Sequence, residues 1–309
     1  MPTALKRPVL CIDIGGTSTK AGVLDSHGEM RFVDSIPSRP DVESYFRALA
    51  CLIKQTIAST RAEFEQPAHE LGIAVAGFLD PGRNCLAYNP NLSWLKNFPL
   101  RQRLTEAFPE LTVELESDSN AATMAEYRFG SGRGAERFLC VIAGTGLGVG
   151  MTVNGEPLRF AHGCMGDIGH VIVQRDGPLC TCGGRGCAEI MVSASVLAER
   201  YRDMAGLPET VTLRDVIEAA ETGNNDAALV LREAGEWLGV AIASMANILF
   251  PDHIAIAGGL SAGGEHVLEP AERIFRETAC ALARSRTTFT RATLGPLAPL
   301  IGAAWPFWR

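Results

Sequence analysis

The stretch VLCIDIGGTSTKAGVLD, residues 9–25, carries a short apolar run rich in β-branched side chains, then glycines, then a second apolar run. This pattern predicts a strand, a tight turn and another strand. It returns later in the chain as FLCVIAGTGLGVGMTV, residues 138–153. Two halves that open alike suggest an ancient duplication.

The segments around these repeats alternate between helix and strand patterns. Apolar side chains recur at a helical period in residues 43–65, 192–205 and 226–250. Short apolar runs predict buried strands at residues 71–80, 111–118 and 253–261. Strands that alternate with helices predict an α/β protein, and 309 residues suit two domains.

The composition is that of a soluble globular protein, with 47% hydrophobic and 20% charged residues. A net charge of −7 supplies no basic excess for binding nucleic acid or anionic membranes. The longest apolar stretch, 237–250, is too short to span a bilayer, and the segment before the first strand leaves no room for a signal peptide. A reducing cytoplasm, with buried free thiols, is expected from the scattered cysteines Cys11, Cys51, Cys85, Cys140, Cys164 and Cys280.

The run GHVIVQRDGPLCTCGGRGCAE, residues 169–189, has the spacing His-x9-Cys-x-Cys-x4-Cys. One imidazole and three thiolates, from His170, Cys180, Cys182 and Cys187, are a ligand set that tetrahedral zinc prefers. Four protein ligands leave no open coordination position, so the predicted zinc is structural. The alternative is a pair of disulfides or free thiols in a loop, which explains neither the spacing nor the histidine.

Acidic side chains stand at both ends of this metal loop. Asp167 precedes His170 by three residues, and Glu189 follows Cys187 by two. A zinc-bound imidazole has a fixed tautomer, so its second nitrogen can offer an N–H donor. Two carboxylates and an oriented donor predict a site for several hydroxyl groups. Each acid alone is more often a solvated loop charge.

Three glycine turns follow apolar strands, at Gly15-Gly16-Thr17, Gly144-Thr145-Gly146 and Gly258-Gly259. Glycine lets backbone N–H groups approach phosphate oxygens, and a threonine hydroxyl adds a donor. One such turn is usually only a turn, but three predict a nucleotide site between two domains. The chain has no P-loop sequence, and its second glycine turn is not a dinucleotide fingerprint.

Two aspartates lie in or at the end of predicted strands. Asp13 stands in an otherwise apolar strand, where Mg²⁺ near phosphates is a natural partner for a carboxylate. Asp118 ends a strand just before a predicted helix, where it could accept the proton of an attacking hydroxyl. The alternatives are a capped structural carboxylate for Asp13 and a helix N-cap for Asp118, a role that Ser119 could equally fill.

Together these motifs resemble the ROK family of sugar kinases, within the actin, Hsp70 and hexokinase-like superfamily. DIGGTSTKAGVLD (13–25) and AGTGLGVG (143–150) resemble the family's two phosphate motifs, and IAIAGGLS (254–261) its adenosine motif. ESDSNAA (116–122) is similar to the catalytic motif, and NPNLSW (89–94) to the family's Asn-Leu-x-x-Trp loop. GDIGH followed by CTCGGRGCAE is the most specific part, and the match runs over nearly the whole chain.

The resemblance implies ATP-dependent phosphorylation of a sugar hydroxyl, with Asp118 as the base, Mg²⁺ at the phosphates and a structural Zn²⁺. The sugar is glucose-like, or an N-acetylhexosamine, fructose, mannose or allose. The implied sugar contacts are Ser117, Asp118, Asp167, His170 and Glu189. The implied nucleotide contacts are Asp13, Gly15, Gly16, Thr17, Lys20, Gly144, Thr145, Gly146, Gly258 and Gly259.

The resemblance also implies an actin-like (ribonuclease H-like) two-domain ATPase fold with an interdomain cleft, and a homodimer. On this fold the N-terminal α/β domain takes residues 1–118, and a C-terminal helix at about 295–309 packs back onto it. Residues 119–294 then form the C-terminal α/β domain, which carries the zinc loop and the nucleotide site.

Two positions depart from the family pattern, since Ser117 replaces the usual Asn and Asp167 the usual Glu. Both side chains are shorter than those they replace, so several sugars stay open. The alternative function is a non-catalytic or weakly active sugar-binding protein of the same fold. ROK regulators carry a helix-turn-helix before the first strand, so the eight residues there and the acidic chain disfavour that role. The zinc loop disfavours an actin-like assembly ATPase.

Overall fold

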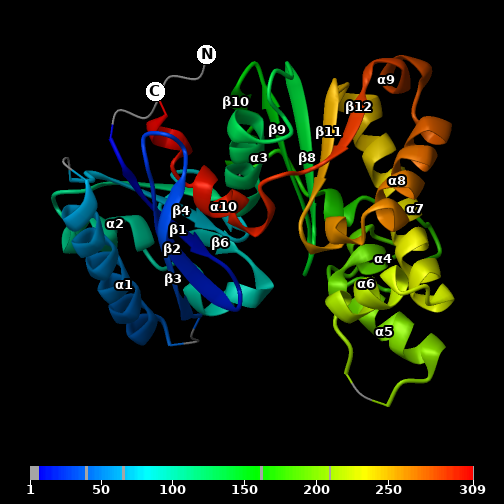
Figure 1. Ribbon diagram of the computed structural model, residues 1–309, viewed down its shortest axis with the longest axis horizontal. Coiled ribbons are helices and arrows are strands. Elements are labelled where there is room, and N and C mark those ends of the chain that lie inside the picture. Colours follow the sequence, from blue (N-terminus) through cyan, green and yellow to red (C-terminus); the bar gives the residue numbers. More distant parts are fainter. Residues whose placement is uncertain (1–6, 39–40, 65–66, 161–162, 209, 309) are drawn as a thin grey trace. The chain divides into compact units, whose positions relative to one another are not determined.

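A computed structural model describes residues 7–38, 41–64, 67–160, 163–208 and 210–308. The chain forms two compact units, each built on one five-stranded mixed sheet (Figure 1). Unit 1 consists of Met1–Phe129, Pro157–Met165 and Leu297–Arg309. Unit 2 consists of Gly130–Glu156 and Gly166–Pro296.

The sheet of unit 1 has the strand order β3-β2-β1-β4-β7. Its strands are β1 (Val9–Ile14), β2 (Ser18–Leu24), β3 (Met30–Pro37), β4 (Glu70–Val75) and β7 (Thr112–Ser117). β1 pairs antiparallel with β2 and parallel with β4, and β4 pairs parallel with β7. The carboxyl ends of β1, β4 and β7 therefore meet at one edge, where ligands bind in open α/β sheets.

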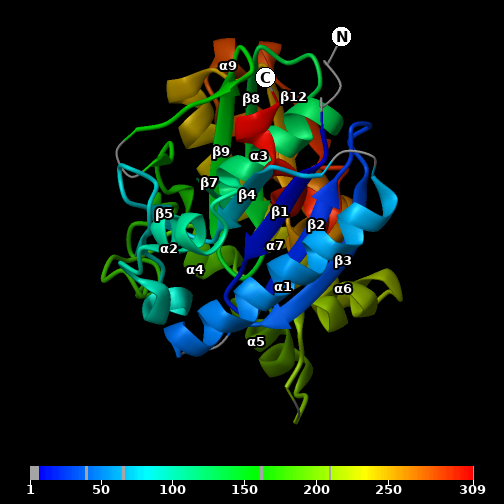
Figure 2. The same ribbon diagram turned by 90° about the vertical axis from the view of Figure 1, so that its left-hand side faces the viewer.

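The side chains of β1 point alternately to the two faces of this sheet, and each face packs against different helices. Leu10, Ile12 and Ile14 join the apolar core that includes helices α1 (Val42–Glu63) and α2 (Leu100–Ala107). α1 lies along this face in both views (Figures 1 and 2). Because successive side chains of a strand point to opposite faces, Cys11 and Asp13 face the other way.

The opposite face is covered by α3 (Asp118–Phe129) and the short α10 (Ala298–Gly302). The approach is close, because a methyl group on Gly302 would lie 1.7 Å from the Ala121 carbonyl oxygen. In the same way, a Cβ on Gly72 of β4 would lie 1.9 Å from the carbonyl oxygen of Ala303. Glycine thus lets backbone meet backbone where the C-terminal segment docks.

Unit 2 repeats the design with the strand order β10-β9-β8-β11-β12. Its strands are β8 (Arg137–Ala143), β9 (Leu147–Val153), β10 (Glu156–Pro157), β11 (His253–Ala257) and β12 (Thr288–Arg291). β11 pairs parallel with both β8 and β12. Its helices are α4 (Glu189–Val192), α5 (Ala194–Ala205), α6 (Leu213–Glu221), α7 (Asn225–Leu249), α8 (Glu265–Thr278) and α9 (Ala281–Arg286).

Short elements complete the described chain. They are the hairpin strands β5 (Phe78–Leu79) and β6 (Leu86–Tyr88), and the 3-10 helices η1 (Pro90–Leu95), η3 (Ile168–His170), η4 (Gly259–Gly263), η5 (Gly295–Leu297) and η6 (Trp305–Phe307). Of the helices in the described residues, none has both the length and the apolarity that crossing a bilayer needs.

Local details differ from the sequence-based expectation at several places. The strand expected at 71–80 stops at Val75, because the backbone turns at Gly77 with a φ of +107°. α3 begins at Asp118 and groups with unit 1, so the two units divide after Phe129 rather than at 118. The expected C-terminal helix is broken, with 3-10 turns on either side of α10.

None of the cysteines outside the metal loop is in a disulfide, as expected, but not all of them are buried. Cys11, Cys140 and Cys164 are buried, whereas Cys51 and Cys280 are exposed. Cys51 lies on the exposed side of α1, and Cys280 lies just before α9, so their expected burial was wrong.

The Gly302 contact yields a stability prediction. Gly302→Ala should lower the free energy of unfolding of unit 1 by at least about 2 kcal/mol, because the added methyl group meets backbone that cannot yield. Denaturant unfolding followed by tryptophan fluorescence measures this, since Trp94, Trp305 and Trp308 all lie in unit 1. Gly144→Ala is the control, because its Cβ meets only an ordinary 3.7 Å contact and should change stability by no more than about 0.5 kcal/mol. Equal stability of the two variants would contradict the docking described.

Candidate functional site

The carboxyl edge of the unit 1 sheet gathers polar groups from three neighbouring strands. Asp13 is the last residue but one of β1, Gly77 follows β4, and Asp118 follows β7. The β1 turn beside them is tight, with the Gly15 N–H donating to the Ser18 carbonyl at 3.0 Å. This edge therefore brings the first predicted glycine turn and the predicted base to one place.

Asp118 is held by backbone donors. Its Oδ1 accepts the N–H of Ser119 at 2.8 Å, and its carboxylate also accepts the N–H of Gly77. Burial raises the pKa of the Asp118 carboxyl, and these N–H groups partly offset that effect. The outcome is a fixed, partly desolvated carboxyl whose pKa is moved toward neutrality.

The helix cap at this junction is Ser117. Its buried Oγ accepts the N–H of Asn120 at 3.3 Å, which is the N-cap hydrogen bond of α3. The alternative interpretation of Asp118 as the N-cap is therefore wrong. Ser and Asn cap helices about equally well, so the departure at 117 preserves this structural role.

Asp13 lies close to both a cation and an anion. The Nζ of Lys20 is 3.9 Å from Asp13 Oδ2. Burial, with the nearby charge of Asp118, raises the pKa of Asp13 to about 6 despite the lowering effect of Lys20. Ionisation of a carboxyl group in this position is unfavourable without a further cation. A Mg²⁺ ion bound with phosphate would supply that positive charge.

A buried carboxylate lies directly behind the candidate base. Glu116, which is 1% exposed, is paired with Arg159 and with Arg83 at 3.5 Å. Its Oε1 accepts the Asn120 side-chain N–H at 2.9 Å, and the same amide donates to the Gly163 carbonyl at 2.8 Å. This network ties Arg159 and Gly163 to the start of α3. A buried ion pair of this kind is costly to break on one side only.

In unit 2 the two remaining glycine turns follow neighbouring parallel strands, β8 and β11. The first is closed by a hydrogen bond from the Gly144 N–H to the Gly146 carbonyl at 2.9 Å. Gly258 has a φ of +83°, and a Cβ there would lie 2.3 Å from the Ala143 carbonyl oxygen. Only glycine fits at this second turn, which brings the two strand ends together.

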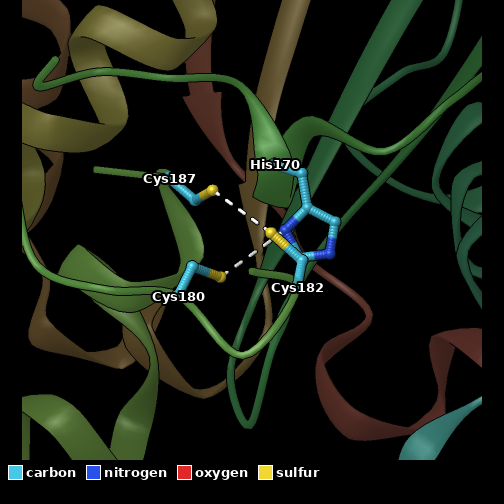
Figure 3. Close-up of side chains that lie close together, drawn as sticks. All are labelled: His170, Cys180, Cys182 and Cys187. Carbon is cyan, nitrogen blue, oxygen red and sulfur yellow. Dashed lines mark hydrogen bonds between the residues drawn. The ribbon is translucent and has the colours of Figure 1, made fainter. Parts of the chain in front are cut away.

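The metal loop gathers its four predicted ligands (Figure 3). One ligand atom from each of His170, Cys180, Cys182 and Cys187 lies within 4.8 Å of the others. The Sγ atoms of Cys182 and Cys187 are 3.6 Å apart, and His170 Nδ1 is 3.9 Å from Cys180 Sγ. Sulfurs bound tetrahedrally at about 2.3 Å from one zinc ion are about 3.7 Å apart, so the cluster fits that metal.

The loop backbone is shaped for this cluster. Gly186 has a φ of +65°, and a Cβ there would lie 1.6 Å from the Gln174 carbonyl oxygen. The Gly184 N–H donates to Cys182 Sγ at 3.4 Å and lowers the pKa of that thiol, which favours the thiolate that a metal requires. None of the nine cysteines, all within the described ranges, is in a disulfide, so the disulfide alternative is wrong.

The second nitrogen of His170 points to the predicted acid. His170 Nε2 is 3.6 Å from Asp167 Oδ2, while Asp167 Oδ1 caps η3 through the Gly169 N–H at 3.0 Å. Glu189 Oε2 accepts the Leu147 N–H at 3.0 Å, next to the first glycine turn of unit 2. The three predicted hydroxyl-binding side chains are thus anchored around one loop.

The predicted residues therefore fall into two groups. Unit 1 holds Asp13, Gly15, Gly16, Thr17, Lys20, Ser117 and Asp118, and unit 2 holds the glycine turns at 144–146 and 258–259, Asp167, His170, Glu189 and the three cysteines. The sequence interpretation missed Gly77, Glu116 and Arg159. A glycine within an apolar strand pattern was the available signal for the first, because it often marks a break.

Two mixed five-stranded sheets with such turns define an actin-like two-domain α/β protein, and solved structures match this fold over almost the whole chain. The chain belongs to the ROK family, whose family model matches residues 9–308.

Three relatives illustrate the range of that family. A glucokinase from Streptomyces coelicolor is 31% identical over 313 residues, which cover 95% of each chain. A ROK family glucokinase from Streptomyces griseus, solved in complex with glucose and AMPPNP, is 29% identical with a TM-score of 0.84, covering 97% of this chain and 98% of that one. A xylose repressor from Caldicellulosiruptor bescii is 26% identical over 249 residues, or 77% of this chain and 61% of the repressor.

The raised pKa of Asp13 predicts a pH-dependent cost to stability. The folded carboxyl binds its proton up to about pH 6 and the unfolded one only to about pH 4, so ionisation destabilises the fold above that window. Without nucleotide or Mg²⁺, Asp13→Asn should raise the free energy of unfolding by about 2 kcal/mol at pH 7.5, and this gain should vanish below pH 4. Urea unfolding between pH 3.5 and 8 measures it, with Asp34→Asn as an exposed control. A gain independent of pH would show that burial of Asp13 is not the cause.

Proposed function

We propose that this protein is an ATP-dependent sugar kinase that phosphorylates a hydroxyl of a hexose or hexose derivative. The observation that carries the proposal is Asp118, a partly desolvated carboxyl at a strand end that two backbone N–H groups hold in place. Ser117, and not Asp118, caps the helix that follows. The named glucokinases among its relatives support the same reaction class.

Asp118 is the proposed base. Its carboxylate accepts the proton of the sugar hydroxyl as the oxygen forms its bond to the γ-phosphorus and the bond from that phosphorus to the β-bridging oxygen breaks. The electron pair of the broken bond leaves with ADP. A pKa raised by burial makes this carboxylate a stronger base than an exposed aspartate.

The glycine turns are the proposed phosphate and nucleotide contacts. Backbone N–H groups at Gly15-Gly16-Thr17, Gly144-Thr145-Gly146 and Gly258-Gly259 suit anionic oxygens, and Lys20 adds a positive charge beside Asp13. Asp13 would hold Mg²⁺, which supplies charge neutralisation to the phosphates when it is bound.

The sugar contacts are proposed to come from Asp118, Ser117 and the acids of the metal loop. Zn²⁺ on His170 Nδ1 and the three cysteines would leave Nε2 as an N–H donor, oriented by Asp167. Glu189, anchored through one oxygen to Leu147, offers its other oxygen to a hydroxyl. Asp167 uses one oxygen to cap η3, and its side chain is one methylene shorter than that of a glutamate.

A sugar-binding protein without turnover is the second candidate. The repressor relative favours it, as do the shorter Ser117 and Asp167. Incubation with ATP and Mg²⁺ against glucose, mannose, fructose, allose and N-acetylhexosamines separates the two. Saturable sugar-dependent ADP formation supports the kinase, whereas sugar binding with no ADP formed supports the second candidate.

Replacement of the base gives the functional prediction. Asp118→Asn should lower kcat about a hundredfold or more with the best sugar, since the amide keeps the shape but cannot accept the proton. ATP and sugar should still bind, as measured by calorimetry. Ser119→Ala is the matched control, because it removes only the 3.3 Å hydroxyl contact to the same carboxylate. Near-normal turnover in Asp118→Asn would place the base elsewhere.

The metal loop gives a second prediction. Protein purified without chelators should contain about one equivalent of zinc by elemental analysis, and Cys187→Ser should contain less than half as much. Cys280→Ser, at an exposed cysteine outside the loop, is the control and should keep its zinc. Metal-free protein with unchanged thermal stability after chelation would contradict a structural zinc.

A further inference from the structure

Asn89, just before η1, lies against the peptide that joins Ala76 to Gly77. Its Nδ2 donates to the Ala76 carbonyl at 3.0 Å. A Cβ on Gly77 would lie only 2.6 Å from the Tyr88 carbonyl oxygen and 2.8 Å from Asn89 Cβ, so the backbone of Gly77 lies close against this segment. The side chain is itself fixed, because Asn89 Oδ1 caps η1 by accepting the Asn91 N–H at 2.8 Å.

The other end of that same peptide reaches the candidate base. The carbonyl of Ala76 and the N–H of Gly77 belong to one planar unit, and this N–H donates to the Asp118 carboxylate. A donor on the carbonyl polarises the peptide and strengthens its N–H as a donor. Asn89, the peptide and Asp118 thus form one chain of hydrogen bonds.

A backbone hydrogen bond also restrains the chain just before this peptide. The Ala76 N–H donates to the Ile14 carbonyl at 3.0 Å, which carries the ladder between β1 and β4 one residue past Val75. Gly77 has a φ of +107°, so its orientation depends on what holds the peptide plane. Asn89 contacts the carbonyl oxygen of this peptide, and Asp118 contacts its N–H at the opposite end.

We propose that Asn89 is a positioning residue for Asp118, acting through the peptide between Ala76 and Gly77. The proposal rests on the proposed kinase function. Asn89 is neutral. The charged groups near the base are Asp13 with Lys20 beside it, and Glu116 with its partners Arg159 and Arg83. A neutral replacement of Asn89 therefore leaves the electrostatic surroundings of Asp118 otherwise unchanged.

The test is Asn89→Ser. Serine also caps helices, so it keeps the acceptor for the Asn91 N–H, but its side chain is too short to donate to Ala76. With the best sugar of the panel, kcat should fall about tenfold, while the KM values for ATP and sugar change less than about twofold. The acidic limb of the kcat profile should move up by about half a pH unit, because Asp118 loses part of its hydrogen-bond support.

Asn224→Ser is the matched control. Asn224 caps α7 in unit 2 by accepting the Ala227 N–H at 3.0 Å, so the same substitution at an N-cap should leave kcat and its pH profile unchanged. A kcat and an acidic limb that stay at wild-type values in Asn89→Ser would overturn the positioning role. So would equal losses in both variants, which would indicate loss of capping alone.

Failure of the proposed function is separable from failure of this inference. If the unmodified protein phosphorylates no sugar, the kinase proposal fails. The Asp118 carboxyl can then be titrated by carbon NMR in the wild type and in Asn89→Ser. A raised pKa in the variant supports the hydrogen-bond chain, and identical titrations overturn it.

Discussion

The central constraint in unit 1 is that two carboxyl groups, Asp13 and Asp118, are partly buried at one sheet edge. The charge of Asp118 disfavours ionisation of Asp13, and burial disfavours the ionised form of both. The surrounding structure meets this cost with the Lys20 ammonium and with backbone N–H groups at Ser119 and Gly77. The direction of three parallel strands brings those groups together, so the strand order is a precondition for the chemistry.

In unit 2 the constraint is different, because the metal loop, which carries the proposed hydroxyl-binding side chains, has little regular structure of its own. The loop from Asp167 to Glu189 contains only a short 3-10 turn and isolated bridges. Its side chains are positioned by the thiol and imidazole cluster and by glycine contacts such as Gly186 against Gln174. A metal ion would give this loop the rigidity that a hydrophobic core gives elsewhere.

The sequence predicted the features that depend on residue type and spacing. The metal ligands and the glycine turns belong to this class, because His170 and the cysteines are chemically distinctive. It could not assign the cap at the β7–α3 junction, which depends on how far Ser117 stays paired with Val75. Nor could it predict the role of Gly77, because the group that acts is a backbone N–H common to almost every residue.

The docking of α10 has a consequence for the order in which the chain can fold during synthesis. The strands of unit 1 are made first, yet residues 298–302, which cover one of its faces, are made after all of unit 2. Nascent domains usually complete from the N-terminus onward. Here the surface of unit 1 around Gly72 and Ala121 stays uncovered until residues 298–302 have been synthesised. All of unit 2 is therefore synthesised before unit 1 can complete its packing.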